Sequence, residues 1–254
     1  MQARIHAIHH NCFCIAASGR MLVFDWPAPD QRPAEAATAL TQLVTGQDAI
    51  AAFSHSHGDH CSADIRDILA VARSSRYILS DDVPDMVPEL DLPGAAIPDP
   101  GDPPPAPGPW TRVDDGVSVS AMASNDLGAA FLIRLGGWRI YYGGDLAEWI
   151  WPEAGDAANA FTAEYFSAAI EHVRAFAPHI ALTNCDPRLP GLSGAARFAD
   201  AVRPACLVPM HSFGNTAHLP DFAQQVARPG MQVFAAARLG ESCTITVDAP
   251  ADAG

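Results

Sequence analysis

The densest group of metal-ligating side chains is the segment SHSHGDH at positions 54–60. It places His55, His57, Asp59 and His60 within six residues, and His and Asp are common ligands of catalytic metals. A loop that follows a buried strand can direct the first two His at one ion and the Asp–His pair at a second. Two-metal hydrolytic sites hold their ions roughly 3.5–4 Å apart. The alternatives are a solvated polar loop or a helix cap at Asp59. Neither accounts as well for three His and one Asp at this spacing, so we expect a metal site.

Two further strand ends carry residues of the same kind. A predicted strand at 138–143 runs into Gly144 and Asp145, and glycine lets the backbone approach whatever the carboxylate holds. A second predicted strand, at 206–209, is followed by Met210 and His211. Each signal is weak alone, because Gly and Asp are ordinary turn residues and a single His is more often structural.

Taken together, these segments resemble the metallo-β-lactamase-fold superfamily of metal-dependent hydrolases. The resemblance spans nearly the whole chain and is closest to a poorly characterised bacterial branch related to lactonase-like members. Further matches are Asp25 after Val23-Phe24, usually a supporting residue, and the segments 186–189 and 209–211. The resemblance implies an α/β fold, a four-layer αββα sandwich in which two mixed β-sheets face each other, helices cover the outside and the metals lie at one edge.

The resemblance also implies two divalent metal ions, with Zn as the first choice and Mn or Fe as alternatives. The ligands of the first ion would be His55, His57 and Asp145. Those of the second would be Asp59, His60, Asp145 and His211, so that Asp145 bridges the two ions. Asp59 would in addition act in catalysis, by orienting the attacking water or passing on a proton.

One position departs from the superfamily pattern. Its first site normally has a third His before the bridging Asp, but no His occurs between His60 and His172. Asp126, in the segment 124–128, stands where that His would come, and we predict it as the substitute ligand. A carboxylate there would favour harder ions such as Mn²⁺ or Fe²⁺. If Asp126 is only a turn residue, the first site is weak and the protein holds a single metal in the second.

Other residues are candidates for binding a substrate. Arg188 could hold an anionic group bidentately, although pairing with Asp186 is an equal alternative. Trp149 could form a pocket wall, although filling the core is the commoner role of an aromatic residue. Apart from these, His9 and His10 near Phe13 lie where a strand end could approach the site, with no role assigned to either.

Composition excludes several other functions. The 254 residues include 29 acidic residues against 15 basic ones, a net charge of −14, and every basic residue is Arg. Without Lys there is no phosphate-binding P-loop, Schiff-base enzyme or Ser–Lys hydrolase, and the negative charge argues against a nucleic-acid partner. No apolar run is long enough for a membrane span and no signal core opens the chain, so we expect a cytoplasmic protein, monomeric or homo-oligomeric.

Periodicity predicts a single layered domain over residues 1–254 in which strands and helices alternate. Strands are expected at 4–9, 12–17, 21–24, 48–54, 76–79, 117–122, 131–135, 138–143, 179–183, 206–209, 232–235 and 242–247. Helices are expected at 62–73, 160–176, 195–202 and 222–226, and between Pro33 and Gly46. The proline-rich segment 81–109 is expected to contain neither helix nor central strand, and to be a surface excursion or a lid.

The expected reaction is attack by metal-activated water on a small, anionic ester, lactone or phosphodiester, because a bound divalent ion lowers the pKa of water toward ~7. Two alternatives remain open: an iron-dependent redox enzyme on the same fold, and a non-catalytic metal-stabilised binding protein. A nuclease ranks last, because the chain has no basic stripe and no room for a large insert.

Overall fold

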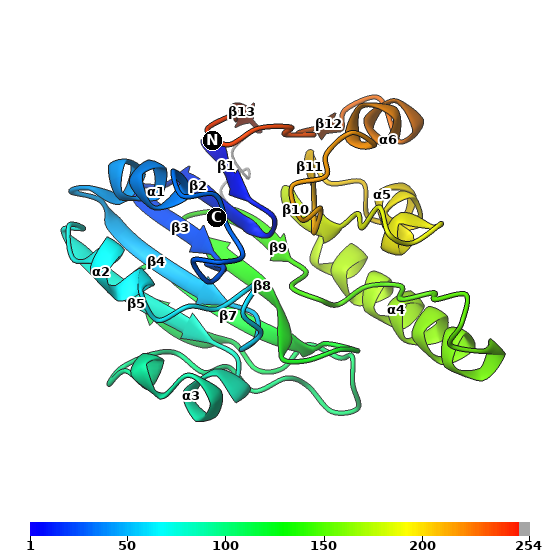
Figure 1. Cartoon of the computed structure of the whole chain (residues 1–254), viewed down its shortest axis with the longest axis horizontal. Coiled ribbons are helices and arrows are strands. Elements are labelled where there is room, and N and C mark those ends of the chain that lie inside the picture. The colour runs from blue at the N-terminus through cyan, green and yellow to red at the C-terminus, as the bar shows by residue number, and fades with distance from the viewer. Residues whose placement is uncertain (249–254) are drawn as a thin grey trace, which may run out of the picture.

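Alternation of buried and exposed residues builds two β-sheets, as β1 (Gln2–His9) illustrates. The computed structural model describes residues 1–248, and Figure 1 shows the arrangement. The first sheet has the order β13 (Ser242–Thr246), β1, β2 (Cys12–Ala17), β3 (Arg20–Phe24), β4 (Asp48–Phe53) and β5 (Ser74–Leu79). The second has the order β12 (Gln232–Val233), β11 (Cys206–Met210), β10 (Ile180–Asn184), β9 (Trp138–Tyr142), β8 (Ala129–Leu135), β7 (Val117–Ala123) and β6 (Thr111–Asp114).

Three apolar clusters separate four layers. The central cluster lies between the sheets and includes Ile15 and Leu22 from the first, and Ile133 and Leu182 from the second. The outer face of the first sheet packs against α1 (Ala36–Val44), α2 (Ile65–Leu69) and α3 (Asp82–Met86). That of the second packs against α4 (Asp156–Phe176), α5 (Ala195–Val202) and α6 (Leu219–Gln225). The predicted αββα sandwich is confirmed.

Parallel pairing aligns the strand ends that matter for the site. β3 runs parallel to β4, and β9, β10 and β11 run parallel to one another. The carboxyl ends of each parallel set therefore meet at one sheet edge, which is where ligands bind in open α/β sheets. Asp25 follows β3, Ser54 follows β4, and His211 follows β11 directly. Asp145 comes three residues after β9.

Two predicted elements differ from the structure. The helix expected at 62–73 is only α2, because Val71 and Arg73 pair through their backbones with Gly46 and Gln47 and turn the chain into β5. The segment 81–109 does contain helix, and that prediction was wrong. α3 and a 3₁₀ turn, η1 (Pro88–Leu90), form there because their prolines lie in the first helical turn, where a missing N–H costs nothing.

Two further observations complete the fold. β6 was not among the predicted strands, and β12 is shorter than the strand expected at 232–235. Within residues 1–248, no helix is both long and apolar enough to cross a membrane.

Candidate metal centre

Two groups of His and Asp side chains converge at the edge formed by these strand ends. In each group the ligand atoms lie within 4.8 Å of one another. The first group is His55, His57 and Asp145; the second is His10, Asp59, His60 and His211. Asp145 lies between them, with Oδ1 3.3 Å from His211 Nε2 and Oδ2 3.6 Å from His55 Nε2. It therefore faces both groups, as the predicted bridging ligand would.

Buried carboxylates fix the ring orientation of two of these histidines. His60 donates from Nδ1 to Asp25 Oδ2 at 2.6 Å, and His211 donates from Nδ1 to Asp186 Oδ2 at 3.1 Å. A proton on Nδ1 leaves the lone pair on Nε2, and both Nε2 atoms face the carboxylate of Asp145. Metal-ligating histidines commonly have such a carboxylate on the second nitrogen.

His55 is oriented in a similar way through a hydroxyl group. The Ser54 hydroxyl donates its single proton to Asp25 at 2.8 Å, so its oxygen accepts from Nδ1 of His55 at 3.0 Å. The lone pair of His55 is then on Nε2, which lies 3.1 Å from Nδ1 of His57. Asp25 thus supports two ligands, in agreement with the supporting role that the resemblance implies.

The donor set fits a divalent cation. Asp145 is 5% exposed, and its Oδ1 has no hydrogen-bond partner among the described residues. A buried carboxylate oxygen without a partner is costly, and a cation facing the Nε2 lone pairs of His55, His60 and His211 would remove that cost. Without an ion, the Asn11 amide donates a hydrogen bond to Nε2 of His60 at 2.8 Å. This contact is further evidence that the lone pair of His60 is on Nε2.

Without an ion, the charges in this group perturb one another strongly. Burial alone would raise the pKa of Asp145, but the facing His60 and His211 hold it well below its ordinary value. Burial would likewise lower the pKa of His211, yet Asp145 and Asp186 raise it to about 9. The metal-free centre therefore retains a second proton on His211, on the Nε2 atom that a metal would need.

Strained backbone and close glycine contacts hold the centre together. Asp25, His10 and His211 have φ values of 43°, 55° and 65°, a region that non-glycine residues rarely adopt and that is often found at functional sites. At Gly144, φ is 49° and a Cβ atom would lie 2.5 Å from Cβ of Ser54. The turn before Asp145 therefore packs directly against the start of the 54–60 loop.

A cavity of about 370 Å³ opens beside the two groups. Its lining residues are His57, Asp59, Asn125, Asp126, Asp145, Trp149, Trp151, Arg188, His211 and Phe213. Asp126 lies in the wall but outside both ligand groups, and burial together with nearby Asp145 raises its pKa. Its role as a metal ligand stays a prediction.

The two predicted substrate residues also lie in this wall. Arg188 donates to Asp186 from Nε at 3.0 Å and from Nη2 at 2.6 Å, so the alternative pairing considered for it is present. Its guanidinium lies over the Phe213 ring, 4.3 Å from the ring centre. Trp149 donates from Nε1 to the backbone oxygen of Asp145, and its ring meets His211 edge-on. Both residues therefore line the cavity while contacting residues of the centre or their supports.

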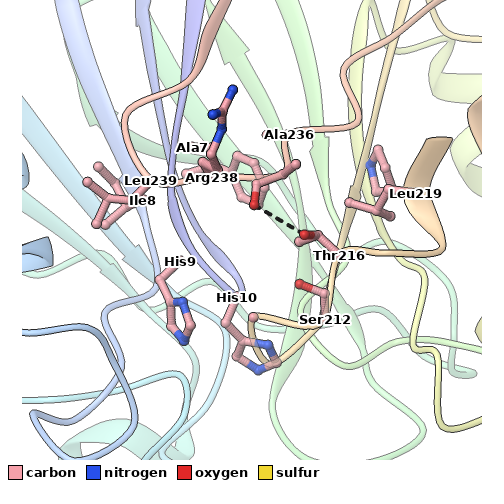
Figure 2. Close-up of a pocket in the computed structure, with 14 residues that line it drawn as sticks. Ala7, Ile8, His9, His10, Ser212, Thr216, Leu219, Ala236, Arg238 and Leu239 are labelled. Atoms are coloured by element: carbon pink, nitrogen blue, oxygen red, sulfur yellow. Dashed lines mark hydrogen bonds between the residues drawn. The ribbon is translucent and has the colours of Figure 1, made fainter.

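His10 belongs to the centre although it was not predicted as a ligand. Its Nε2 lies 3.3 Å from Asp59 Oδ2, and burial lowers its pKa to about 3. Figure 2 shows it next to Ser212 at the end of a separate small cavity of about 60 Å³. The one signal in the sequence was the pair His9-His10 between two predicted strands.

Solved structures with a similar course of the chain identify the fold. No protein-family model and no curated protein matches the sequence. YhfI of Bacillus subtilis, a metallo-β-lactamase fold protein, superimposes with a TM-score of 0.59 at 14% identity over 96% of this chain and 99% of its own. The chain has the metallo-β-lactamase fold. Igni18, a metallo hydrolase from Ignicoccus hospitalis, matches with a TM-score of 0.66 at 16% identity over 98% of this chain and 100% of its own.

A third structural neighbour is CmlA of Streptomyces venezuelae, a diiron β-hydroxylase. It matches with a TM-score of 0.60 at 13% identity, over 96% of this chain and 54% of CmlA. At these identities the likeness concerns the fold. The observations about the centre rest on this chain's own residues.

Proposed function

We propose that the protein is a metal-dependent hydrolase of a small anionic ester, lactone or phosphodiester. The observation that carries the proposal is the convergence of Nε2 lone pairs from His60 and His211 on the unpartnered Oδ1 of Asp145. Each lone pair is set by a buried carboxylate on the other ring nitrogen. Such a donor set suits Zn²⁺, Mn²⁺ or Fe²⁺.

Divalent ions bound here would polarise the substrate oxygen and lower the pKa of water toward neutrality. Asp59 is the chain's own candidate for handling the proton. Burial would raise its pKa, but the hydrogen bond from His10 and the charge of His60 hold it well below its ordinary value. An ionised carboxylate at the cavity wall can accept a hydrogen bond from water and orient it toward the substrate.

The cavity wall supports a small anionic substrate. Its volume is in the range of small-molecule sites, and Trp149, Trp151 and Phe213 supply apolar surface. Asp186 accepts from two of the three nitrogens of Arg188; for the third, Nη1, no partner is found among the described residues. We infer that Nη1 is available to a carboxylate or phosphate group of the substrate.

The test combines metal analysis with a substrate panel. Protein purified without chelators is analysed for bound metal and assayed on lactones, p-nitrophenyl esters and bis(p-nitrophenyl) phosphate. We expect Asp145→Ala to lose metal and activity together, while His172→Ala, which alters a His on the outer helix α4, keeps both. Full turnover by metal-free protein would exclude the proposal. Bound metal with no turnover would favour a non-catalytic binding protein.

A second candidate function is an iron-dependent redox enzyme. The fold is shared with diiron CmlA, and the carboxylate of Asp126 near the first ligand group would favour a harder ion than Zn²⁺. Iron in the purified protein together with substrate-dependent O₂ consumption would select this function. Hydrolysis by the Zn²⁺-loaded protein without O₂ uptake would exclude it.

A further inference from the structure

His10 is a member of the second group, but the partners of its ring nitrogens differ from those of His60 and His211. It occupies the turn between β1 and β2, and only 5% of the residue is exposed. Its Nε2 faces Asp59 Oδ2 at 3.3 Å, and its Nδ1 lies 3.1 Å from the backbone nitrogen of Phe213. Both ring nitrogens thus have a defined partner.

These partners determine where the imidazole proton is. A backbone N–H can only donate, so the Phe213 amide requires a lone pair on Nδ1 of His10. The single proton of the neutral ring is then on Nε2, from which it is donated to Asp59. A ligand that binds metal through Nε2 needs the reverse arrangement, with the proton on Nδ1, and that proton would point at the Phe213 N–H. His60 and His211 have this reverse arrangement, because carboxylates accept from their Nδ1 atoms.

We propose that His10 is a positioning residue that donates a hydrogen bond to Asp59, and that it is not a metal ligand although it lies within ligand distance of the group. The inference rests on the proposed metal centre. The bond occupies one oxygen of Asp59 and leaves the other for an ion or a water molecule. The loop after β11 supplies both His211 and the Phe213 amide, so it places a ligand and sets the tautomer of His10 at the same time.

Phe213 also connects His10 to the substrate side of the cavity. The centre of its ring lies 4.0 Å from the centre of the His10 ring. The guanidinium of Arg188 lies over the same Phe213 ring, 4.3 Å from its centre. The tautomer of His10 is therefore held by a residue that also lines the cavity. Arg188 is thus connected to Asp59 through a chain of contacts by way of the Phe213 and His10 rings.

Two substitutions separate donation from ligation. In His10→Gln, the amide nitrogen can replace Nε2 as a donor to Asp59. In His10→Asn, the shorter amide can still accept from Phe213 but does not reach Asp59, and Asn tolerates the positive φ at this position. His9→Asn is the matched control, because His9 lies outside both ligand groups.

The readouts are Co²⁺ affinity and the Co²⁺ visible spectrum. For His10→Asn we expect an unchanged number of bound ions, unchanged band positions and a 10- to 100-fold lower affinity, as is typical of a lost supporting hydrogen bond. His10→Gln should recover most of the affinity, and His9→Asn should match the wild type. A shifted spectrum and equal loss in both His10 variants would show that His10 is a ligand and overturn the proposal.

A measurement on the unaltered chain keeps the test independent of folding and of metal binding. Long-range ¹H–¹⁵N spectra of the histidine rings report which nitrogen of His10 carries the proton. We expect Nε2–H both without metal and with Zn²⁺. A proton on Nδ1 in either state contradicts the proposal. If the wild type binds no metal, the proposed function fails, while the metal-free spectrum still decides the tautomer.

Discussion

At the residue scale, the centre depends on carboxylates that are not ligands themselves. Asp186 is fully buried and accepts hydrogen bonds from His211 and from Arg188. One side chain therefore orients His211, a predicted metal ligand, and holds the arginine at the cavity wall. Asp25 has the corresponding place on the other side of the centre, where it accepts from His60, from Ser54 and from the hydroxyl of Tyr142.

Replacing Asp186 tests this dual role. In Asp186→Asn the side chain is neutral and can present its NH₂ group to Nδ1 of His211, so the ring loses its fixed orientation. We expect Zn²⁺ affinity to fall 10- to 100-fold in a chelator competition. Asp200→Asn removes a carboxylate from an exposed pair with Arg228 and should leave the affinity unchanged. Equal affinities for Asp186→Asn and the wild type would contradict the role.

Metal binding should also release protons. The pKa of His211 is raised to about 9, so at pH 7 the metal-free centre holds a proton that a metal displaces. The apparent affinity should therefore increase with pH until about 9. Calorimetric titration with Zn²⁺ in buffers of different ionisation enthalpy measures the released protons. A binding enthalpy independent of the buffer at pH 7 would refute the expectation.

The sequence predicts most of the side chains that gather at this centre, and Asp25 as a support, but not which ring each supporting group contacts. His55, His57, Asp59 and His60 are neighbours in the sequence, so their shared purpose is visible in one motif. The supports come from distant segments: Asp25 lies 35 residues from His60, and the Phe213 amide lies 203 residues from His10. Contacts at such separation depend on how the sheets pack, which no local pattern encodes.

At the element scale, most strands were predictable because each is a short apolar run bounded by turn residues, whereas β6, with Val113 as its one apolar residue, was not. The errors arose where local propensity was too coarse a guide. Prolines at the start of a helical turn are tolerated, which explains α3 and η1, and α2 ends early because its last residues join the backbone of a neighbouring turn. The strand ends reach the centre through two glycine contacts, Gly128 and Gly144 against the 54–60 loop.

Gly144→Ala tests the closer fit of these elements. A Cβ at this position would clash with Ser54, in addition to the strain of a positive φ. Gly19→Ala, in the turn between β2 and β3, has a φ of 73° but no atom within 4 Å, so it isolates the strain. We expect a loss of about 1 kcal/mol for the control and a larger loss for Gly144→Ala, from urea unfolding. Only Gly144→Ala should also weaken Zn²⁺ binding, and equal effects of the two variants would contradict the packing argument.

At the scale of the whole molecule, charge and metal are linked. Two bound divalent ions would change the formal charge from −14 to −10, since −14 + 4 = −10. Because the 15 Arg are outnumbered by 29 acidic residues and there is no Lys, the electrostatic field of the whole protein repels anions. Attraction for an anionic substrate must then come from the metals and from residues such as Arg188, so selection takes place in the cavity.

The metal ions should also hold the two sheets together. The first sheet leads into His55, His57, Asp59 and His60, whereas Asp145 and His211 follow strands of the second. Binding to the folded state alone stabilises it by about 2.7 kcal/mol at a free metal concentration of 100 times Kd. For a chain of this size, that corresponds to a Tm increase of about 5–10 °C. Differential scanning calorimetry with Zn²⁺ and with EDTA measures the shift, which Asp145→Ala should abolish and His172→Ala should retain. An identical Tm in both conditions for the wild type would show that metal does not stabilise the folded chain and would contradict this prediction.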